Sequence, residues 1–155
     1  MELRKERGSS ILEFAIGASL LVLLFTGIFQ FGYTFYAYSK LENAVRAGAR
    51  FAALSVYPVS GPTTNSSPSS AFVTQVKNVT VYGHPNGAVD GRTPMVSGLT
   101  TDHVSVNVAF SNNVPTSVSV GISGLRVDGI FGSWQSNGKP KVLFQYVGRY
   151  APPIT

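Results

Sequence analysis

The chain of 155 residues contains no cysteine and few charged residues. Without cysteine it has no disulfide framework, no zinc–thiolate site and no cysteine nucleophile. Charged residues make up 12% of the sequence, whereas ordinary soluble domains carry about 25%. Only seven acids and two histidines are present, which leaves few side chains for acid–base chemistry or metal binding. The sequence therefore argues against an enzyme, and we expect no catalytic residue, no metal and no cofactor.

The basic excess does not indicate a nucleic-acid partner. A net charge of +5 arises from twelve bases set against seven acids, and the bases are dispersed along the chain. The sequence has no block of five or six like charges, the pattern typical of basic interaction tails. We therefore expect no binding to nucleic acid.

The apolar residues gather near the N-terminus. Between Ser9 and Ser39 the only charged residue is Glu13. A membrane-spanning helix needs about 20 predominantly apolar residues, and we predict one over residues 11–38. Three bases stand in residues 1–8 ahead of this segment. The positive-inside rule then places the N-terminus in the cytoplasm and the C-terminal part outside, as expected for a single-pass membrane protein.

Three interpretations of this segment compete. A cleaved secretory signal has an apolar core of about 7–15 residues, but this run is longer and continues into Tyr38 without a loop. A plain signal anchor leaves Glu13 unexplained, because a carboxylate inside a bilayer segment is costly and usually functional. The third interpretation uses the residues around Gly8.

Residues 7–14 read Arg-Gly-Ser-Ser-Ile-Leu-Glu-Phe, which resembles the processing site of type IV prepilins. The resemblance implies that residues 1–8 form a leader, which a prepilin peptidase removes between Gly8 and Ser9. It also implies that the apolar segment is retained, first as a membrane anchor and then as filament core. Glu13 would meet the new α-amine of a neighbouring subunit, because an unpaired charge in low dielectric is strongly unfavourable. The alternative is that Glu13 snorkels to water at the interface.

We predict a single helix over residues 9–56, because no proline interrupts it. Its second half is amphipathic: Leu41, Val45, Gly48 and Ala52 recur at helical spacing, with Phe51 beside them. This face should pack against a globular part, and its small residues should let a sheet approach closely.

The first half of the helix is rich in aromatic residues. Phe25, Phe29 and Tyr33 follow one another at intervals of four and share one face of a helix. We expect these three residues and Phe14 to pack against other helices in a filament.

The pair at residues 31–32 and the segment 36–53 make the resemblance more specific. The pairs Phe31-Gly32 and Asn43-Ala44 and the run Gly48-Ala49-Arg50-Phe51-Ala52 resemble the signature of TadE-like proteins of the tight adherence pilus system. Ala47 departs from that signature, which often has glutamate there. The resemblance covers residues 1 to about 56 and implies a pilin or pseudopilin, with other pilin subunits, the prepilin peptidase and the tight adherence assembly platform as partners.

The remaining sequence predicts a small β domain. Residues 57–70 are rich in Ser, Thr, Asn, Gly and Pro and are predicted to be a linker. A short helix over 71–77, capped by Ser69 or Ser70, and a short strand over 79–82 should follow. Alternating apolar residues then predict antiparallel strands over 104–110, 118–122 and 142–147. The expected fold is α+β, with one long helix packed on a small antiparallel sheet within an outer domain of residues 71–155.

Residues 129–134 place Phe131 and Trp134 among glycines. They are either a loop that closes over the core or a subunit contact, because exposed apolar patches mark interaction sites.

The resemblance implies a minor pilin or pseudopilin that is inserted in the bacterial inner membrane and moves to a cell-surface pilus used in adhesion. One alternative is an uncleaved, membrane-anchored module that binds a surface ligand. The other is the repeating major subunit of the filament.

Overall fold

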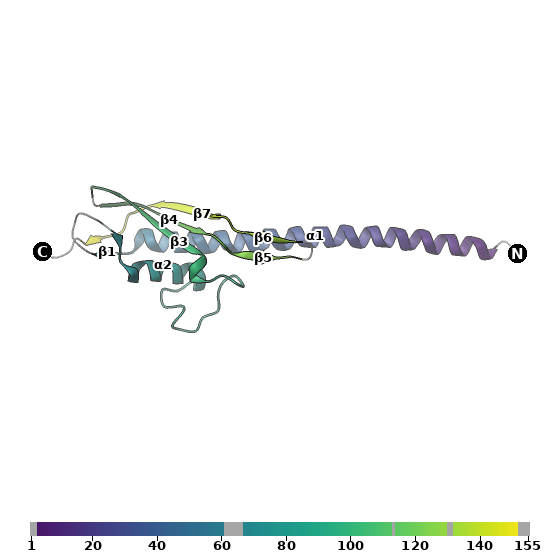
Figure 1. The fold of residues 1–155 in the computed structure, drawn as a ribbon, viewed down its shortest axis with the longest axis horizontal. Coiled ribbons are helices and arrows are strands. Elements are labelled where there is room, and N and C mark those ends of the chain that lie inside the picture. The colour runs from purple at the N-terminus through teal and green to yellow at the C-terminus, as the bar shows by residue number, and fades with distance from the viewer. Residues whose placement is uncertain (1–2, 61–66, 113, 130–131, 152–155) are drawn as a thin grey trace.

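One long helix organises the molecule. The computed structural model describes residues 3–60, 67–112, 114–129 and 132–151. Helix α1 runs from Leu3 to Leu54, and the outer domain is built around its C-terminal half while the N-terminal half projects bare (Figure 1). At about 1.5 Å per residue, 52 residues make a rod of about 78 Å. The predicted long helix is confirmed, but it begins at Leu3, so residues 3–8 continue it rather than forming a separate segment.

The main sheet has three antiparallel strands in the order β3-β4-β7. They comprise β3 (Val104–Ser111), β4 (Val114–Ile122) and β7 (Lys141–Gln145). Val120 of the central strand pairs with Val106 on one side and Val142 on the other. The side chains of Val118, Val120 and Ile122 are fully buried. The alternating pattern therefore identified the three strands, although β4 begins earlier and β7 ends earlier than predicted and Phe144 is exposed. The α+β fold is confirmed.

Helix α2 runs from Ser70 to Tyr82. The Ser69 side chain caps it by accepting a hydrogen bond from the Phe72 amide at 3.2 Å, and Gly83 ends it in the left-handed conformation. The predicted strand over 79–82 is therefore wrong, since these residues form the last turn of α2. Their β-branched side chains favour strands, but burial of Val81 and Thr80 in the core outweighs that local preference.

The predicted linker over 57–70 contains regular structure. Strand β1 (Tyr57–Ser60) pairs in parallel with β8 (Tyr150–Ala151) and antiparallel with β2 (Ser67–Pro68). Tyr57 is fully buried. Its ring packs edge-on against Phe72, Phe110 and Tyr146, with centroid distances of 5.0, 5.7 and 6.0 Å. Because residues 57–70 are mostly polar or proline, their composition gives no indication that Tyr57 is buried in the core.

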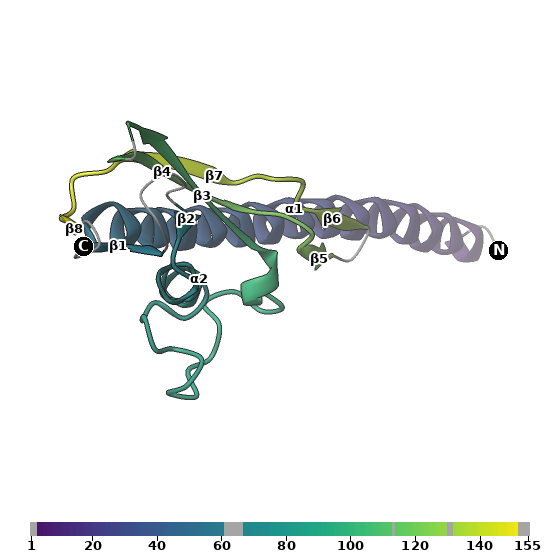
Figure 2. The ribbon, with the colours of Figure 1, turned by 60° about the vertical axis from the view of Figure 1, so that its left-hand side comes forward.

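The core lies around the C-terminal half of α1. That half packs against α2 and against β4 and β7, and Figure 2 shows α2 on one side of it and the sheet on the other. Buried apolar residues of the helix, of α2 and of the sheet form one continuous cluster. The expectation that a sheet alone would cover the helix was incomplete, because α2 covers the opposite side.

A second, smaller β unit extends along α1. Strands β5 (Arg126–Asp128) and β6 (Ser133–Gln135) form an antiparallel pair in which Val127 is opposite Trp134. This hairpin reaches further toward the N-terminal end of α1 than the main sheet does (Figure 1). These two strands were not expected from the sequence.

Candidate assembly surface

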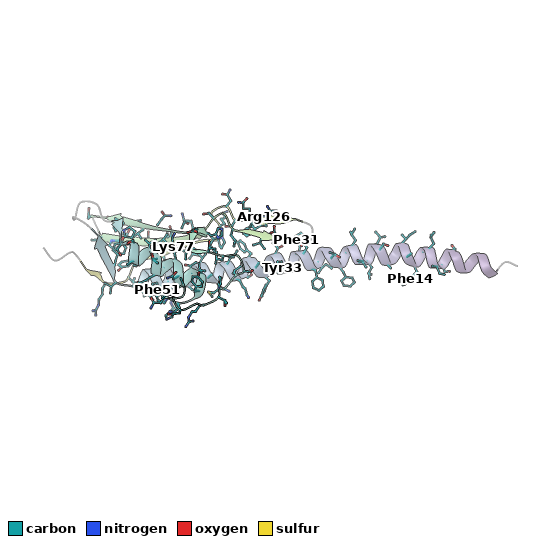
Figure 3. The ribbon with its side chains drawn as sticks, turned by 60° about the horizontal axis from the view of Figure 1, so that its bottom comes forward. Phe14, Phe31, Tyr33, Phe51, Lys77 and Arg126 are labelled. Atoms are coloured by element: carbon teal, nitrogen blue, oxygen red, sulfur yellow. The ribbon has the colours of Figure 1, made fainter. Side chains whose placement is uncertain are left out.

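The N-terminal half of α1 exposes apolar side chains all round. Phe14 is 77% exposed and Phe29 is 73% exposed, and Phe25 is exposed as well. Figure 3 shows Phe14 on the bare part of the rod, away from the outer domain. The helix is long and apolar enough to cross a membrane. A helix that is hydrophobic on every side requires an apolar environment or apolar partners.

Glu13 lies on this exposed apolar part of the helix. Gly8 and Ser9 lie about one helical turn before it, within α1, and are also exposed. Ser9 and Glu13 are four residues apart and therefore share one face of the helix. After cleavage between Gly8 and Ser9, an α-amine and a carboxylate would stand on the same face, one turn apart.

The C-terminal half of α1 is the face that holds the outer domain. Leu41, Val45 and Ala52 are fully buried, and Phe51 is half-buried against the core. Gly48 is buried directly against α2: a Cβ atom added there would overlap Thr80 Oγ1 and lie 3.1 Å from Thr80 Cβ. This position therefore sets how closely α1 and α2 approach each other.

The hairpin packs on the middle of α1. Trp134 is half-buried, and its ring lies edge-on to Tyr38 with centroids 5.8 Å apart. Gly129 lies against the side chain of Gln30, so closely that an added Cβ atom would overlap it. Trp134 of β6 therefore packs against α1 of the same chain, which agrees with the first of the two predicted roles, closure over the core. Phe131 lies outside the described residues.

Charged and aromatic side chains line the junction between the helix and the hairpin. Arg126 Nε donates to Asp128 Oδ1 at 2.8 Å, and Lys40 Nζ lies 4.7 Å from the ring centroid of Tyr36. A cavity of about 390 Å³ opens between these groups, with Tyr33 on its wall. Figure 3 shows Tyr33 and Arg126 at the level where the outer domain meets the bare helix.

The histidines take part in local turn structure. His84 Nδ1 lies 3.3 Å from Asp90 Oδ2, and His103 Nδ1 accepts a hydrogen bond from the Thr100 amide at 3.2 Å. Within residues 3–60, 67–112, 114–129 and 132–151, no three His, Asp or Glu residues come together in a group that could hold a metal ion.

Two tyrosines lie close to the C-terminal end of α1: Tyr57 is fully buried and Tyr146 is partly buried. The Tyr146 hydroxyl donates a shared hydrogen bond to the carbonyl oxygens of Ser55, at 2.7 Å, and Arg149, at 2.9 Å. The Tyr57 hydroxyl is buried and has no hydrogen-bond partner among the described residues. Burial raises the pKa of Tyr57, and the nearby Tyr146 raises it further. Burial also raises the pKa of Tyr146, which a hydrogen bond with the Tyr57 backbone partly offsets. The ring contacts of Tyr57 and the hydroxyl of Tyr146 thus connect the segment that follows α1 to the outer domain.

Comparison with known proteins gives a match to a protein-family model. Residues 8–50 match the model of the family described as TadE-like protein. No curated protein and no solved structure matches the chain. The matched segment begins at Gly8, includes Glu13 and the bare apolar helix, and ends within the face that holds the outer domain. Residues 8–50 of this chain are therefore similar to the corresponding segment of TadE-like proteins.

Proposed function

We propose that this chain is a minor pilin or pseudopilin of a tight adherence pilus, with an assembly role rather than an enzymatic one. The observation that carries the proposal is the TadE-like match over residues 8–50, which covers the helix half whose apolar side chains are exposed and continues into the half that holds the outer domain. An isolated helix of this kind is stable in lipid or when bundled with similar helices.

The proposed route has two stages. The chain first sits in the inner membrane with its N-terminus in the cytoplasm and the outer domain outside. A prepilin peptidase then cuts between Gly8 and Ser9, and the tight adherence assembly platform draws the helix into a filament. There Phe14, Phe25, Phe29 and Tyr33 would contact neighbouring helices. Glu13 would pair with the α-amine of the next subunit and so set the axial register. An unpaired charge buried in an apolar helix bundle costs on the order of several kcal/mol, so this pairing would be strongly favoured.

Two substitutions test this route. Gly8→Ala should leave the protein at precursor size in an electrophoretic assay of cells that contain the peptidase, because the cleavage site is altered. Glu13→Gln should be processed normally but should be lost from sheared filaments, because the amide keeps the side-chain shape without the charge. A normally sized mature product from Gly8→Ala contradicts the cleavage step.

Glu42→Gln is the matched control for Glu13→Gln. Glu42 lies on the same helix but in the outer domain, where it forms a surface ion pair with Arg46. An exposed pair of this kind contributes at most about 1 kcal/mol, so Glu42→Gln should assemble like the parent. Equal incorporation of both variants contradicts the pairing role of Glu13.

The same experiments distinguish this proposal from two other functions. An intact N-terminus with no filament association identifies an uncleaved membrane-anchored module instead. Copy number in purified pili separates a minor subunit from the repeating one. We favour the minor role because this chain has a folded outer domain, whereas the major pilins of the tight adherence system are very short.

A further inference from the structure

The cavity of about 390 Å³ lies where α1, β5 and the loop over residues 95–98 meet. Its polar lining residues from the helix and the strand are Tyr33, Tyr36, Lys40, Arg126 and Asp128. Figure 3 labels Tyr33 on the helix and Arg126 on the strand. The volume is within the range of about 300–1,000 Å³ that is usual for small-ligand sites. The assembly route proposed above does not use this cavity.

The lining of the cavity carries one positive charge in excess. Arg126 Nε donates to Asp128 Oδ1 at 2.8 Å, so these two charges offset each other. Lys40 has no carboxylate partner among the described residues, and its ammonium lies 4.7 Å from the ring centroid of Tyr36. An exposed cation above an aromatic ring is held only weakly, so the ammonium remains available to an anion. The cavity therefore suits a group with a single negative charge.

The uncharged part of the lining favours a carboxylate that is carried on a side chain. Four residues supply apolar wall, namely Ala37, Met95, Val96 and Val127. Of these, Ala37 and Val96 are buried. Ser97 and the two tyrosines add hydroxyl groups, which can donate to carboxylate oxygens. An apolar wall beside a cation matches the methylene groups and the carboxylate of an acidic side chain.

A second copy of this chain is a poor source of that carboxylate. Residues 39–155 contain nine lysines and arginines but four acids. Three of these acids already have a basic neighbour: Glu42 has Arg46, Asp90 has His84 and Asp128 has Arg126. In the part of the chain that the structure describes, Asp102 alone among the four lacks such a neighbour. Two copies side by side would therefore bring mainly like charges together, which is unfavourable.

We propose that this cavity receives an aspartate or glutamate side chain of a different filament subunit, and that this side chain pairs with Lys40. The contact joins the outer domain of this chain to an acidic neighbour and disfavours a second copy at the same place. It agrees with a minor subunit whose neighbours are other proteins. This inference rests on the proposed entry into a filament and adds the chemistry of the neighbour.

Zero-length cross-linking tests the contact directly, because it joins an amine to a carboxylate only when the two groups touch. A water-soluble carbodiimide activates the carboxylate, and the Lys40 amine then displaces the urea to form an amide. Sheared filaments that contain the chain are treated with this reagent and digested with chymotrypsin, which cuts after Tyr38 and releases Lys40 in a short peptide. Lys77, Lys139 and Lys141 are internal controls, because they do not line the cavity.

Mass spectrometry should identify Lys40 joined to an aspartate or glutamate in a peptide that this sequence does not contain. Lys40→Arg should abolish the cross-link but keep the chain in the filaments, because the charge is retained without the reactive amine. Lys40→Gln should lose the cross-link and lower the amount of chain in the filament fraction about twofold to fivefold, the effect of one partly exposed ion pair. Lys141→Gln is the matched control on the exposed side of β7 and should assemble like the parent.

A Lys40 side chain that stays unlinked in filaments that contain the chain overturns the proposal. A link from Lys40 to an acid of this sequence, such as Asp128 or the Asp102 of a second copy, overturns the assignment to a different subunit. Equal recovery of Lys40→Gln and Lys141→Gln in the filaments overturns the pairing role of Lys40. If the parent chain is absent from the filaments, the proposed function fails first, and this inference fails with it.

Discussion

The contact between Gly48 and Thr80 offers a sharp test of how α1 holds the outer domain. Thr80 is fully buried, and its hydroxyl donates to the Val76 carbonyl at 2.8 Å, so it cannot easily turn away. A methyl group at position 48 would overlap that hydroxyl oxygen and lie 3.5 Å from the Thr80 Cα atom. Gly48→Ala should therefore push α2 away from α1 and lower the free energy of unfolding of the outer domain.

The magnitude follows from two opposing effects. Overpacking a well-packed site costs about 1–3 kcal/mol. Alanine is a better helix former than glycine by about 1 kcal/mol. The net loss for Gly48→Ala should be about 1 kcal/mol, which lowers the midpoint of thermal unfolding by about 4–8 °C for a domain of roughly this size. Gly48→Val adds more volume without the propensity gain and should lose about 3 kcal/mol, at the upper end of the overpacking range.

The assay is denaturant unfolding of the full-length chain in detergent micelles, followed by Trp134 fluorescence. Ala47→Val is the matched control, because Ala47 is the exposed neighbour of Gly48 on the same helix; it should change stability by well under about 1 kcal/mol. In a double-mutant cycle, Thr80→Ala should reduce the cost of Gly48→Ala by about 1 kcal/mol, because the overlapping oxygen is gone. A Gly48→Ala variant at least as stable as the parent, or the same cost in both backgrounds, refutes the close approach.

The other predictions concern the core, the cap and the tyrosines. Leu41→Ala should lower the free energy of unfolding by about 2–5 kcal/mol, since Leu41 is fully buried. Ser69→Ala should cost about 1 kcal/mol in the same assay, because it removes the cap of α2. Tyr146→Phe should cost about 1 kcal/mol through its lost hydrogen bond, whereas Tyr57→Phe should be neutral or stabilising because the Tyr57 hydroxyl is buried without a partner among the described residues. The raised pKa of Tyr57 means that the folded state retains a proton which the unfolded state loses, so parent stability should fall as pH rises above about 10. Tyr57→Phe should fall less steeply over that range in denaturant titrations.

The helix and the main sheet were predictable because their patterns are local. Leu41 and Val45 recur at helical spacing, and Val118 and Val120 recur at the spacing of a strand, so each element identifies its own buried face. The residues around Gly8 and Glu13 are likewise a short contiguous motif, and the TadE-like match begins at the same place.

The remainder depends on contacts that are distant in sequence. Residues 79–82 are β-branched or aromatic and favour a strand on their own, but burial against α1 keeps them helical. Tyr57 lies in a polar stretch, and only its neighbours Phe72, Phe110 and Tyr146 show that it is an anchor. The β5–β6 hairpin has three residues in each strand, too few for an alternating pattern, and its position depends on packing of Trp134 against Tyr38.

Entry of this chain into a filament through a processed N-terminal helix can be tested directly. The most direct test is mass spectrometry of the intact protein recovered from sheared filaments. We predict a mature chain that begins at Ser9 and is enriched in the filament fraction. A chain that retains Met1, stays with the membrane and is absent from the filaments would show that the proposed processing and assembly do not occur.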